Sequence, residues 1–286
     1  MKLNNLNFKN QSSIFKNLNL LVFKSFIKDS RNYVFMIIMP IFLTTIFFYV
    51  FDKRGATVFS YALLPCLTII TSLTPSIVEW KNSVFLKRID ITGVKKSMFI
   101  ASVWFVYLLA GIVCYLIILV YGLILASVSL KGKDFIEFQH MFSTIKYGYL
   151  VLSIFLVCIT SIAIATFLGG LANAPGAIQG IVMIVYFITM FLSGVMLPPQ
   201  LIYSSKVLVI ATYLIPHKYC VFLYLHAMNP GGWKDIVKIM PTQNPMSFQG
   251  AYNSFTHSWQ PIIGSISALI LLFIITIKTF KWTAKR

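Results

Sequence analysis

The sequence predicts an all-α integral membrane protein with six transmembrane helices, and two observations support this fold class. Of the 286 residues, 58% are hydrophobic and only 11% are charged, whereas soluble domains carry about 25% charged residues. The apolar residues also gather into six runs without a charged side chain, each close to the length that crosses a bilayer. A large soluble enzyme with buried helices would not show six such runs. The predicted spans are residues 33–51, 58–78, 98–126, 147–170, 181–197 and 261–277.

Residues 1–32 precede the first span and are predicted to form a cytoplasmic segment with an amphipathic helix. Phe15, Leu18, Val22 and Phe26 recur at helical spacing, with lysines largely on other faces. Such a helix can lie at the membrane interface, and a helix packed against the other spans is an equally good interpretation. The first span starts too late, and is too long, for a cleavable signal peptide. Residues 33–286 then form a single membrane domain.

The distribution of basic residues predicts cytoplasmic N- and C-termini. The net charge is +17, which in a soluble protein would suggest nucleic acid as a partner. Here 15 of the 24 Lys and Arg residues fall in the segments that lie inside under this topology, where they are also denser. This agrees with the positive-inside rule, although Lys53 and Arg54 lie on the opposite side. No nucleic-acid partner is predicted.

Prolines and hydroxyl side chains occur within the spans. Pro40, Pro65 and Pro75 predict kinks that neighbouring helices accommodate. Two polar stripes at helical spacing are candidates for lining a pathway, and they consist of Thr68, Thr71 and Ser72 in the second span and Tyr186 and Thr189 in the fifth. Alternatively, such small and polar residues simply allow helices to pack closely.

The connections between spans differ in polarity. Residues 79–93 are the most polar cytoplasmic stretch, and they are long enough for a short helix that ends at Gly93. Residues 171–180 are uncharged, and Pro175-Gly176 predicts a turn. On the outer side, residues 198–260 begin with Pro198-Pro199, which cannot continue a straight helix. The apolar but interrupted stretch that follows predicts helices that dip into the outer leaflet and return, before a more polar segment from residue 227.

The sequence lacks the motifs of catalysis and of nucleotide binding. It contains no phosphate-binding loop of the Gly-x-x-x-x-Gly-Lys-Ser/Thr type, so ATP and Mg²⁺ are not expected on this chain. The four cysteines suggest neither disulfides nor a metal site: Cys66, Cys114 and Cys158 lie in spans, and Cys220 lies alone in the outer segment. The four histidines and seven carboxylates all fall outside the predicted spans. Ion-coupled transporters place ionisable groups at membrane depth, so any uphill transport would need energy from a partner.

Three features in this order resemble the permease subunits of ABC transporters of the type-2 exporter family. The first is Glu79–Gly93, which looks like the family's coupling helix. The second is Ser193-Gly194 followed by Pro198-Pro199, similar to the family's turn after the fifth span. The third, Pro216-His217-Lys218-Tyr219, is similar to the Pro-x-x-Tyr that closes the outer re-entrant helices. The resemblance covers almost the whole chain, although the outer segment up to Trp259 is longer than the family usually has.

The resemblance implies a transport subunit without enzymatic activity, energised by a separately encoded ABC ATPase that binds ATP and Mg²⁺. It also implies a complex of two permeases, identical or related, and two ATPases that usually exports its substrate. The residues implied in ATPase docking are Glu79, Phe85, Leu86, Lys87 and Arg88. Those implied in the outer gate are Ser193, Gly194, Leu197, Pro198, Pro199, Pro216 and Tyr219.

Two other classes remain open as alternatives. One is an ion channel or ion-coupled carrier, which should show charged rings or carboxylates at the membrane midplane. The other is a membrane-embedded enzyme, which should show a cluster of catalytic polar residues. The predicted location is the plasma membrane, and the abundance of Lys, Asn, Ile and Phe suggests a bacterial gene. Lipid-like molecules, drugs, peptides and glycans all remain possible substrates.

Overall fold

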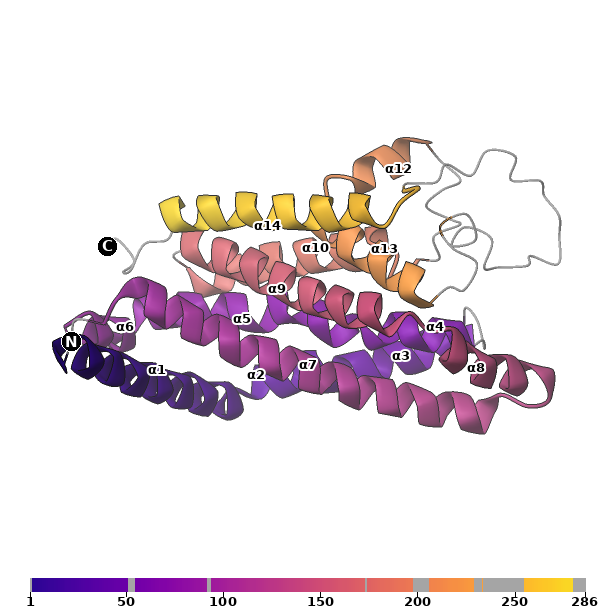
Figure 1. Cartoon of the computed structure of the whole chain (residues 1–286), viewed down its shortest axis with the longest axis horizontal. Coiled ribbons are helices and arrows are strands. Elements are labelled where there is room, and N and C mark those ends of the chain that lie inside the picture. Colours follow the sequence, from indigo (N-terminus) through magenta and orange to yellow (C-terminus); the bar gives the residue numbers. More distant parts are fainter. Residues whose placement is uncertain are drawn as a thin grey trace.

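The computed structural model describes residues 2–50, 55–91, 94–172, 174–197, 206–228, 233 and 255–279. Within these residues every regular element is a helix, and most helices run roughly along one long axis (Figure 1). The short helix α6 (Val84–Ile91) lies at one end of this bundle, and α8 (Lys133–Thr144) lies at the other. We refer to these as the α6 end and the α8 end. The all-helical prediction is therefore confirmed for the described part of the chain.

The remaining elements follow in chain order. They are α1 (Lys2–Lys28), α2 (Ser30–Tyr33), the π-helix η1 (Val34–Ile38), α3 (Met39–Val50), α4 (Gly55–Ala62), α5 (Leu64–Asn82), α7 (Lys96–Ser129), α9 (Tyr147–Leu171), α10 (Pro175–Leu192), α12 (Lys206–Thr212), α13 (Pro216–Met228) and α14 (Trp259–Thr279).

Five helical segments are long and apolar enough to cross a membrane. These are Ser30–Val50, Val58–Asn82, Lys96–Ser129, Tyr147–Leu171 and Trp259–Thr276. The predicted fifth span, residues 181–197, is only partly helical, because α10 ends at Leu192 and is followed by a turn. At 1.5 Å per residue its apolar part, Gly176–Leu192, is about 25 Å long, somewhat less than the hydrocarbon thickness. A sixth crossing by α10 therefore stays a prediction.

Helix α5 forms the centre of the bundle. The apolar window of its span is completely buried within the chain, whereas only 28% of the window in α7 and 17% of that in α14 are buried. Helices α9, α10, α7 and η1 pack around α5. The outward faces of α7 and α14 carry exposed apolar side chains, such as Val113 and Leu271, as expected for surfaces that contact lipid or another membrane protein.

The prolines have different structural effects. Pro40 follows the π-helix η1, in which the Met39 amide donates to the Val34 carbonyl, so the kink predicted there takes the form of a π-type turn. Pro65 lies at the start of α5, after a break at Leu63, whereas α5 continues through Pro75. The turn predicted at Pro175 is wrong, because Pro175 begins α10. Proline is well suited to the first helical position, where its missing N–H would have no helical partner.

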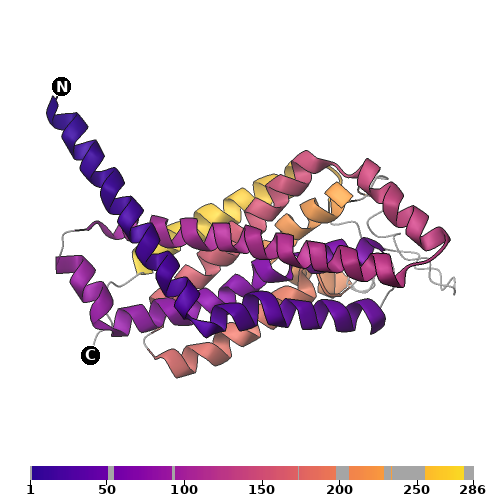
Figure 2. The ribbon, with the colours of Figure 1, turned by 90° about the horizontal axis from the view of Figure 1, so that it is seen from below.

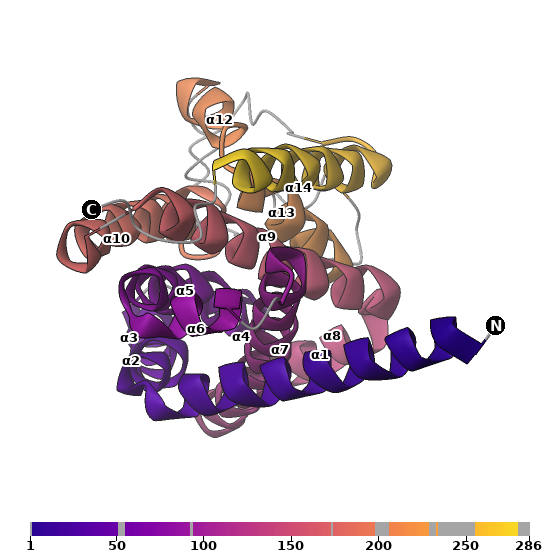
Figure 3. The same cartoon turned by 90° about the vertical axis from the view of Figure 1, so that its left-hand side faces the viewer.

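Helix α1 crosses the bundle obliquely near the α6 end (Figures 2 and 3). It packs mainly on α7, where Leu18 and Val22 are buried and the Phe26 ring meets Tyr107 edge-on at 5.3 Å. The predicted apolar stripe therefore packs against a span, as the second interpretation had it. Further apolar residues on α1, such as Leu20 and Phe23, are exposed, and their placement at a membrane interface stays a prediction.

Candidate functional site

The predicted coupling segment 79–93 consists of parts of two helices. Helix α5 continues through Asn82, and α6 starts at Val84 after a single-residue break. At this break the Ser83 amide donates to the Glu79 carbonyl, and the Ser83 hydroxyl donates to the Trp80 carbonyl. The single helix predicted from residue 79 is therefore wrong, and Glu79 belongs to the long central helix. Residues 92 and 93 lie outside the described residues.

Helix α6 has one face turned toward the bundle. Leu86 and Ile89 are buried, whereas Val84 is 59% exposed and Ile91 is 85% exposed. Leu86 had been predicted to insert into a partner, but in this conformation it packs within its own chain, because the i, i+3 spacing places it beside Ile89 on the inner face. The side chains of Phe85, Lys87 and Arg88 lie outside the described part, so the docking role of this helix stays a prediction.

Glu79 takes part in a charged cluster that sequence analysis missed. Both of its carboxylate oxygens accept hydrogen bonds of 2.6 Å from the Arg31 guanidinium. The same guanidinium donates to Asp29 at 2.7 and 2.9 Å, and Asp29 in turn accepts from Ser76 and caps α2. Burial by itself would raise the pKa of Asp29, but the hydrogen bonds and charge of Arg31 lower it overall. The cluster joins α2 to α5.

Lys81 makes a second polar connection at this end of α5. Its side chain is 1% exposed, and Nζ donates to the carbonyls of Gly169, Gly170 and Ala172 at 3.1, 2.7 and 2.8 Å. These carbonyls lie at the C-terminal end of α9, where the helix leaves its last acceptors without intrahelical partners. Lys81 thus joins α5 to α9. Sequence analysis had counted it only as a cytoplasmic positive charge, since a partner 88 residues away leaves no local pattern.

The predicted pathway residues are packed inside the bundle. Thr68, Thr71 and Ser72 are each buried, and their hydroxyls donate to carbonyls one turn back in α5. Tyr186 and Thr189 on α10 are also buried, and the Tyr186 hydroxyl has no hydrogen-bond partner among the described residues. This conformation therefore shows the close-packing alternative, and a role in lining a pathway stays a prediction.

The predicted outer gate begins with a tight turn after α10. Ser193 is buried, and Gly194 adopts φ of +93°, a conformation that favours glycine. The Met196 amide donates to the Met190 carbonyl, which closes the turn, and Leu197 is half-buried. Pro198 and Pro199 lie outside the described residues, as do most of residues 229–254.

Helices α12 and α13 are joined by a three-residue turn, and α13 folds back along α9 and α14. Pro216 begins α13, and the Tyr219 hydroxyl donates to the Tyr213 carbonyl in the turn. His217 Nε2 lies 2.8 Å from the hydroxyl of Ser161, in the middle part of α9. At the other end of α13 the Ala227 carbonyl accepts from the amide of Lys146, just before α9 begins. Helix α13 therefore runs beside the half of α9 nearer the α8 end.

This arrangement buries two ionisable side chains that the predicted topology places outside the spans. His217 is completely buried and Lys218 is 1% exposed, and His217 contacts the interior of a helix long enough to span a membrane. Lys218 Nζ donates to the hydroxyl of Thr212 at 2.6 Å and to the carbonyl of Val209 at 3.3 Å, and it lies 3.5 Å from the centre of the Tyr213 ring. The sequence placed both residues in the stretch predicted to dip into the outer leaflet and return, and the structure packs α13 between α9 and α14.

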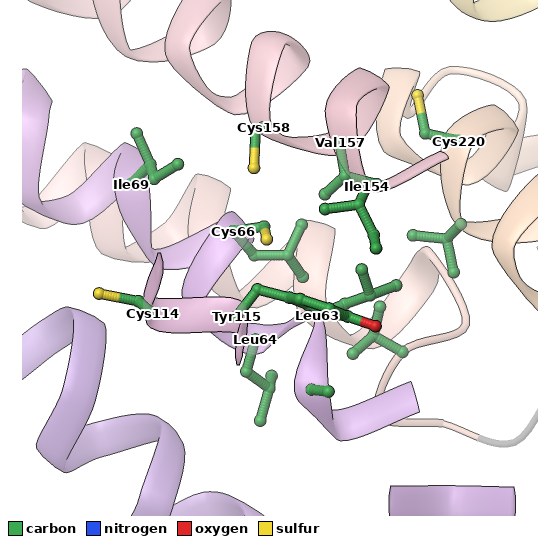
Figure 4. Packing of buried hydrophobic residues seen from close by; sticks show 14 of the residues in the cluster. Leu63, Leu64, Cys66, Ile69, Cys114, Tyr115, Ile154, Val157, Cys158 and Cys220 are labelled. Atoms are coloured by element: carbon green, nitrogen blue, oxygen red, sulfur yellow. The ribbon is translucent and has the colours of Figure 1, made fainter. Parts of the chain in front are cut away.

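All four cysteines are buried and free. Cys66 on α5 and Cys158 on α9 point toward one another across the helix interface (Figure 4). They lie among apolar side chains, as predicted for cysteines within spans. Cys220, predicted to lie in the outer segment, is also buried, with its sulfur 3.6 Å from the Thr160 hydroxyl. Among the residues that the structure describes, no group of three or more His, Cys, Asp or Glu side chains is placed to hold a metal ion.

Comparison with known proteins identifies the family. A search of curated proteins returned no match. A family model described as "ABC-2 family transporter protein" matches residues 54–279, which is well over half of the chain. The matched region contains four of the five candidate spans, α6 and the α12–α13 turn. The chain therefore belongs to the ABC-2 family of transporter proteins, as a membrane-embedded transport subunit.

Proposed function

We propose that this chain is the transmembrane half of an ATP-driven exporter and that a separate ATPase docks on α6. Permeases of the ABC-2 family normally work with an ABC ATPase, so ATP and Mg²⁺ would bind to that partner. The observation that carries the docking site is the position of α6. It is a short helix at the end of the bundle between two candidate spans, and it leaves apolar side chains exposed outside them.

The two faces of α6 suit this role. The inner face, with Leu86 and Ile89, holds the helix on the bundle, while Val84 and Ile91 remain exposed. Exposed apolar side chains beyond the membrane-spanning part favour burial against another protein. Buried apolar anchors contribute most of the affinity at such contacts, and charges at the rim contribute less. Phe85, Lys87 and Arg88 belong to the same helix and remain part of the proposed docking surface.

Closure of the ATPases would rock the helices as rigid bodies and open the outer side near the Gly194 turn and the α12–α13 turn. We propose a complex with two permeases and two ATPases in the plasma membrane of a bacterium, with the α6 end in the cytoplasm. The substrate would be a lipid-like molecule, a drug, a peptide or a glycan. In this view the hydroxyls on α5 and α10 line the path only when the helices separate.

An ion-coupled carrier and a membrane-embedded enzyme are weaker alternatives, and one observation favours the carrier. An ion-coupled carrier would use buried ionisable groups, and His217 and Lys218 are such groups. Family membership nevertheless favours an ATP-driven mechanism. A membrane-embedded enzyme would need a cluster of catalytic side chains, and the polar clusters found at Arg31, Lys81 and Lys218 are occupied by contacts within the chain.

The docking proposal is tested by co-expression with the ATPase encoded nearest to the gene. Changing Val84→Ser together with Ile91→Ser should weaken co-purification of the ATPase by roughly 30-fold in affinity, since a lost anchor costs about 2 kcal/mol. Ile136→Ser provides the matched control, because Ile136 is 64% exposed on α8 at the opposite end, and it should leave the complex intact.

Two results would contradict the proposal. If the double variant on α6 retains its ATPase as well as the wild type, the contact lies elsewhere. If the purified chain hydrolyses ATP without a partner, it is not a transport subunit of this type.

A further inference from the structure

Lys81 lies where α5, α6 and α9 meet at the α6 end. It occupies the last turn of α5, and only Asn82 and Ser83 separate it from α6. Its ammonium group has three donors, and three carbonyls at the end of α9 accept from it. The end of a helix carries a partial negative charge. A buried cation therefore finds there both hydrogen-bond acceptors and a favourable field.

The contact between α5 and α9 is close around this lysine. A Cβ atom added at Gly169 would lie 2.9 Å from Ile77 Cβ and 3.2 Å from the Thr74 carbonyl. One turn further into the bundle, the Thr74 hydroxyl donates to the Ala165 carbonyl at 3.3 Å. Because backbone carbonyls of a helix cannot change rotamer as a side-chain partner can, Lys81 holds α5 to a rigid surface.

The ion pair between Arg31 and Glu79, which joins α2 to α5, is more exposed than the Lys81 contact. The side chains of Arg31 and Glu79 are 32% and 47% exposed, so water and salt screen their interaction. Of the two connections at this end, the one to α9 is thus the better shielded. It is also nearer to α6 along the chain.

We infer that Lys81 is a positioning residue that makes the α5–α6 junction and the C-terminal end of α9 move as one body. A displacement of α6 then reaches α9 directly. This inference rests on the proposed function, in which an ATPase pushes on α6. Without Lys81 the ATPase would still dock, since Lys81 is buried, but its motion would be transmitted less completely into the bundle.

The test measures one distance in the complete transporter with its ATPase. Spin labels are placed at Asn82→Cys and Leu171→Cys, which replace exposed residues at the ends of α5 and α9, while the native cysteines are buried. In the wild-type background we expect one distance distribution that does not change between the nucleotide-free and ATP-trapped complexes. With Lys81→Met the distance should change on ATP binding. Transport per ATP hydrolysed should fall by roughly tenfold or more, because the variant loses all three charged hydrogen bonds to the end of α9.

The control variants separate this role from simple stabilisation. Lys81→Arg keeps a charged donor and should keep the distance constant. Arg31→Gln removes the charge from the exposed connection to Glu79 and should change the distance little. If Lys81→Met does not insert into the membrane, Lys81→Gln replaces it, because the amide still donates hydrogen bonds but carries no charge.

Two results would overturn the inference. One is a Lys81→Met or Lys81→Gln complex that keeps both a constant distance and full transport per ATP. The other is a wild-type distance that changes on ATP binding. If the wild type binds no ATPase at all, the proposed function is wrong. Binding of the ATPase is therefore measured on the wild type before any Lys81 variant is compared.

Discussion

Two lysines of this transporter subunit are equally buried but differently held. Lys81, at the α6 end, donates to three backbone carbonyls at the end of α9. Lys218, in the first turn of α13, donates to one carbonyl and one hydroxyl and lies over the face of a tyrosine ring, with two phenylalanine rings further away. The hydrogen-bond acceptors of Lys81 lie at least 88 residues further along the chain, whereas the hydrogen-bond acceptors of Lys218 lie within nine residues of it.

The difference suggests separate roles for the two regions. A contact between distant helices fixes their relative position, so the α6 end is built as a rigid junction. A contact within one turn stabilises that turn and leaves its position on the bundle to apolar packing, here mainly of α13 on α9 and α14. Burial also lowers the pKa of Lys218 to about 7, while the Tyr213 ring and the Thr212 hydroxyl favour its charged form. The start of α13 therefore holds a charge that responds to pH.

The largest expected effect is a difference in thiol labelling between the two ends of α7, which are predicted to face opposite sides of the membrane. Lys95 and Lys131 are exposed and flank the two ends of α7. In intact cells an impermeant thiol reagent should label a cysteine at Lys131 and not one at Lys95, because the predicted topology places the α6 end inside. Labelling after cell lysis is the control for Lys95. Equal labelling of both positions in sealed cells would refute the topology.

The tightness of the α6 end can be tested with two glycines of α9. Gly169→Ala should destabilise the protein by about 2 kcal/mol, since the added methyl group overlaps Ile77 in a packed interface. Gly148→Ala, near the other end of the same helix, meets nothing within 4 Å. It should be neutral or stabilising by up to about 1 kcal/mol through helix propensity.

Thermal or denaturant unfolding in detergent measures both variants. If Gly169→Ala is as stable as Gly148→Ala, the α6 end of α9 is packed no more tightly than its other end. If Gly169→Ala also weakens the coupling assigned to Lys81, that coupling depends on the close packing of α5 on α9.

A smaller effect is expected from the titration of Lys218 at the start of α13. Because the pKa of Lys218 falls from 10.5 to about 7 on folding, the unfolded chain binds more protons than the folded chain between these values. The free energy of unfolding should therefore rise as the pH rises from 7 to 10.5, and this contribution should be constant below pH 7.

Lys218→Met should remove that slope, and Lys131→Met, at an exposed lysine, should retain it. Unfolding curves at a series of pH values provide the measurement. An unchanged slope in Lys218→Met would assign the pH dependence to another group.

Several features were within reach of sequence reasoning because they depend on composition and local spacing. Five of the six long apolar runs coincide with helices long enough to span a membrane, since a bilayer demands roughly twenty apolar residues in a row. A short helix was predicted between the second and third runs, where α6 lies, although its start was placed too early. The turn at Ser193-Gly194, where φ of +93° favours glycine, was indicated only by the resemblance and lies within the predicted fifth span. The order of these motifs also indicated the family that the comparison then confirmed.

Tertiary structure alone decided which polar residues are in contact. The resemblance grouped Glu79 and Leu86 as one docking surface, yet a helix break separates them. Glu79 then pairs with Arg31, and Leu86 turns inward. His217 and Lys218 were placed outside the spans, in the stretch predicted to dip into the outer leaflet, and the packing of α13 along α9 buries both within the chain. The carbonyls that accept from Lys81 belong to a helix end. Because every residue has a backbone carbonyl, the sequence does not show which ones will accept a hydrogen bond. Hydrophobicity along the chain sets which segments enter the membrane, but the burial of a polar group depends on partners that only folding brings within hydrogen-bonding distance.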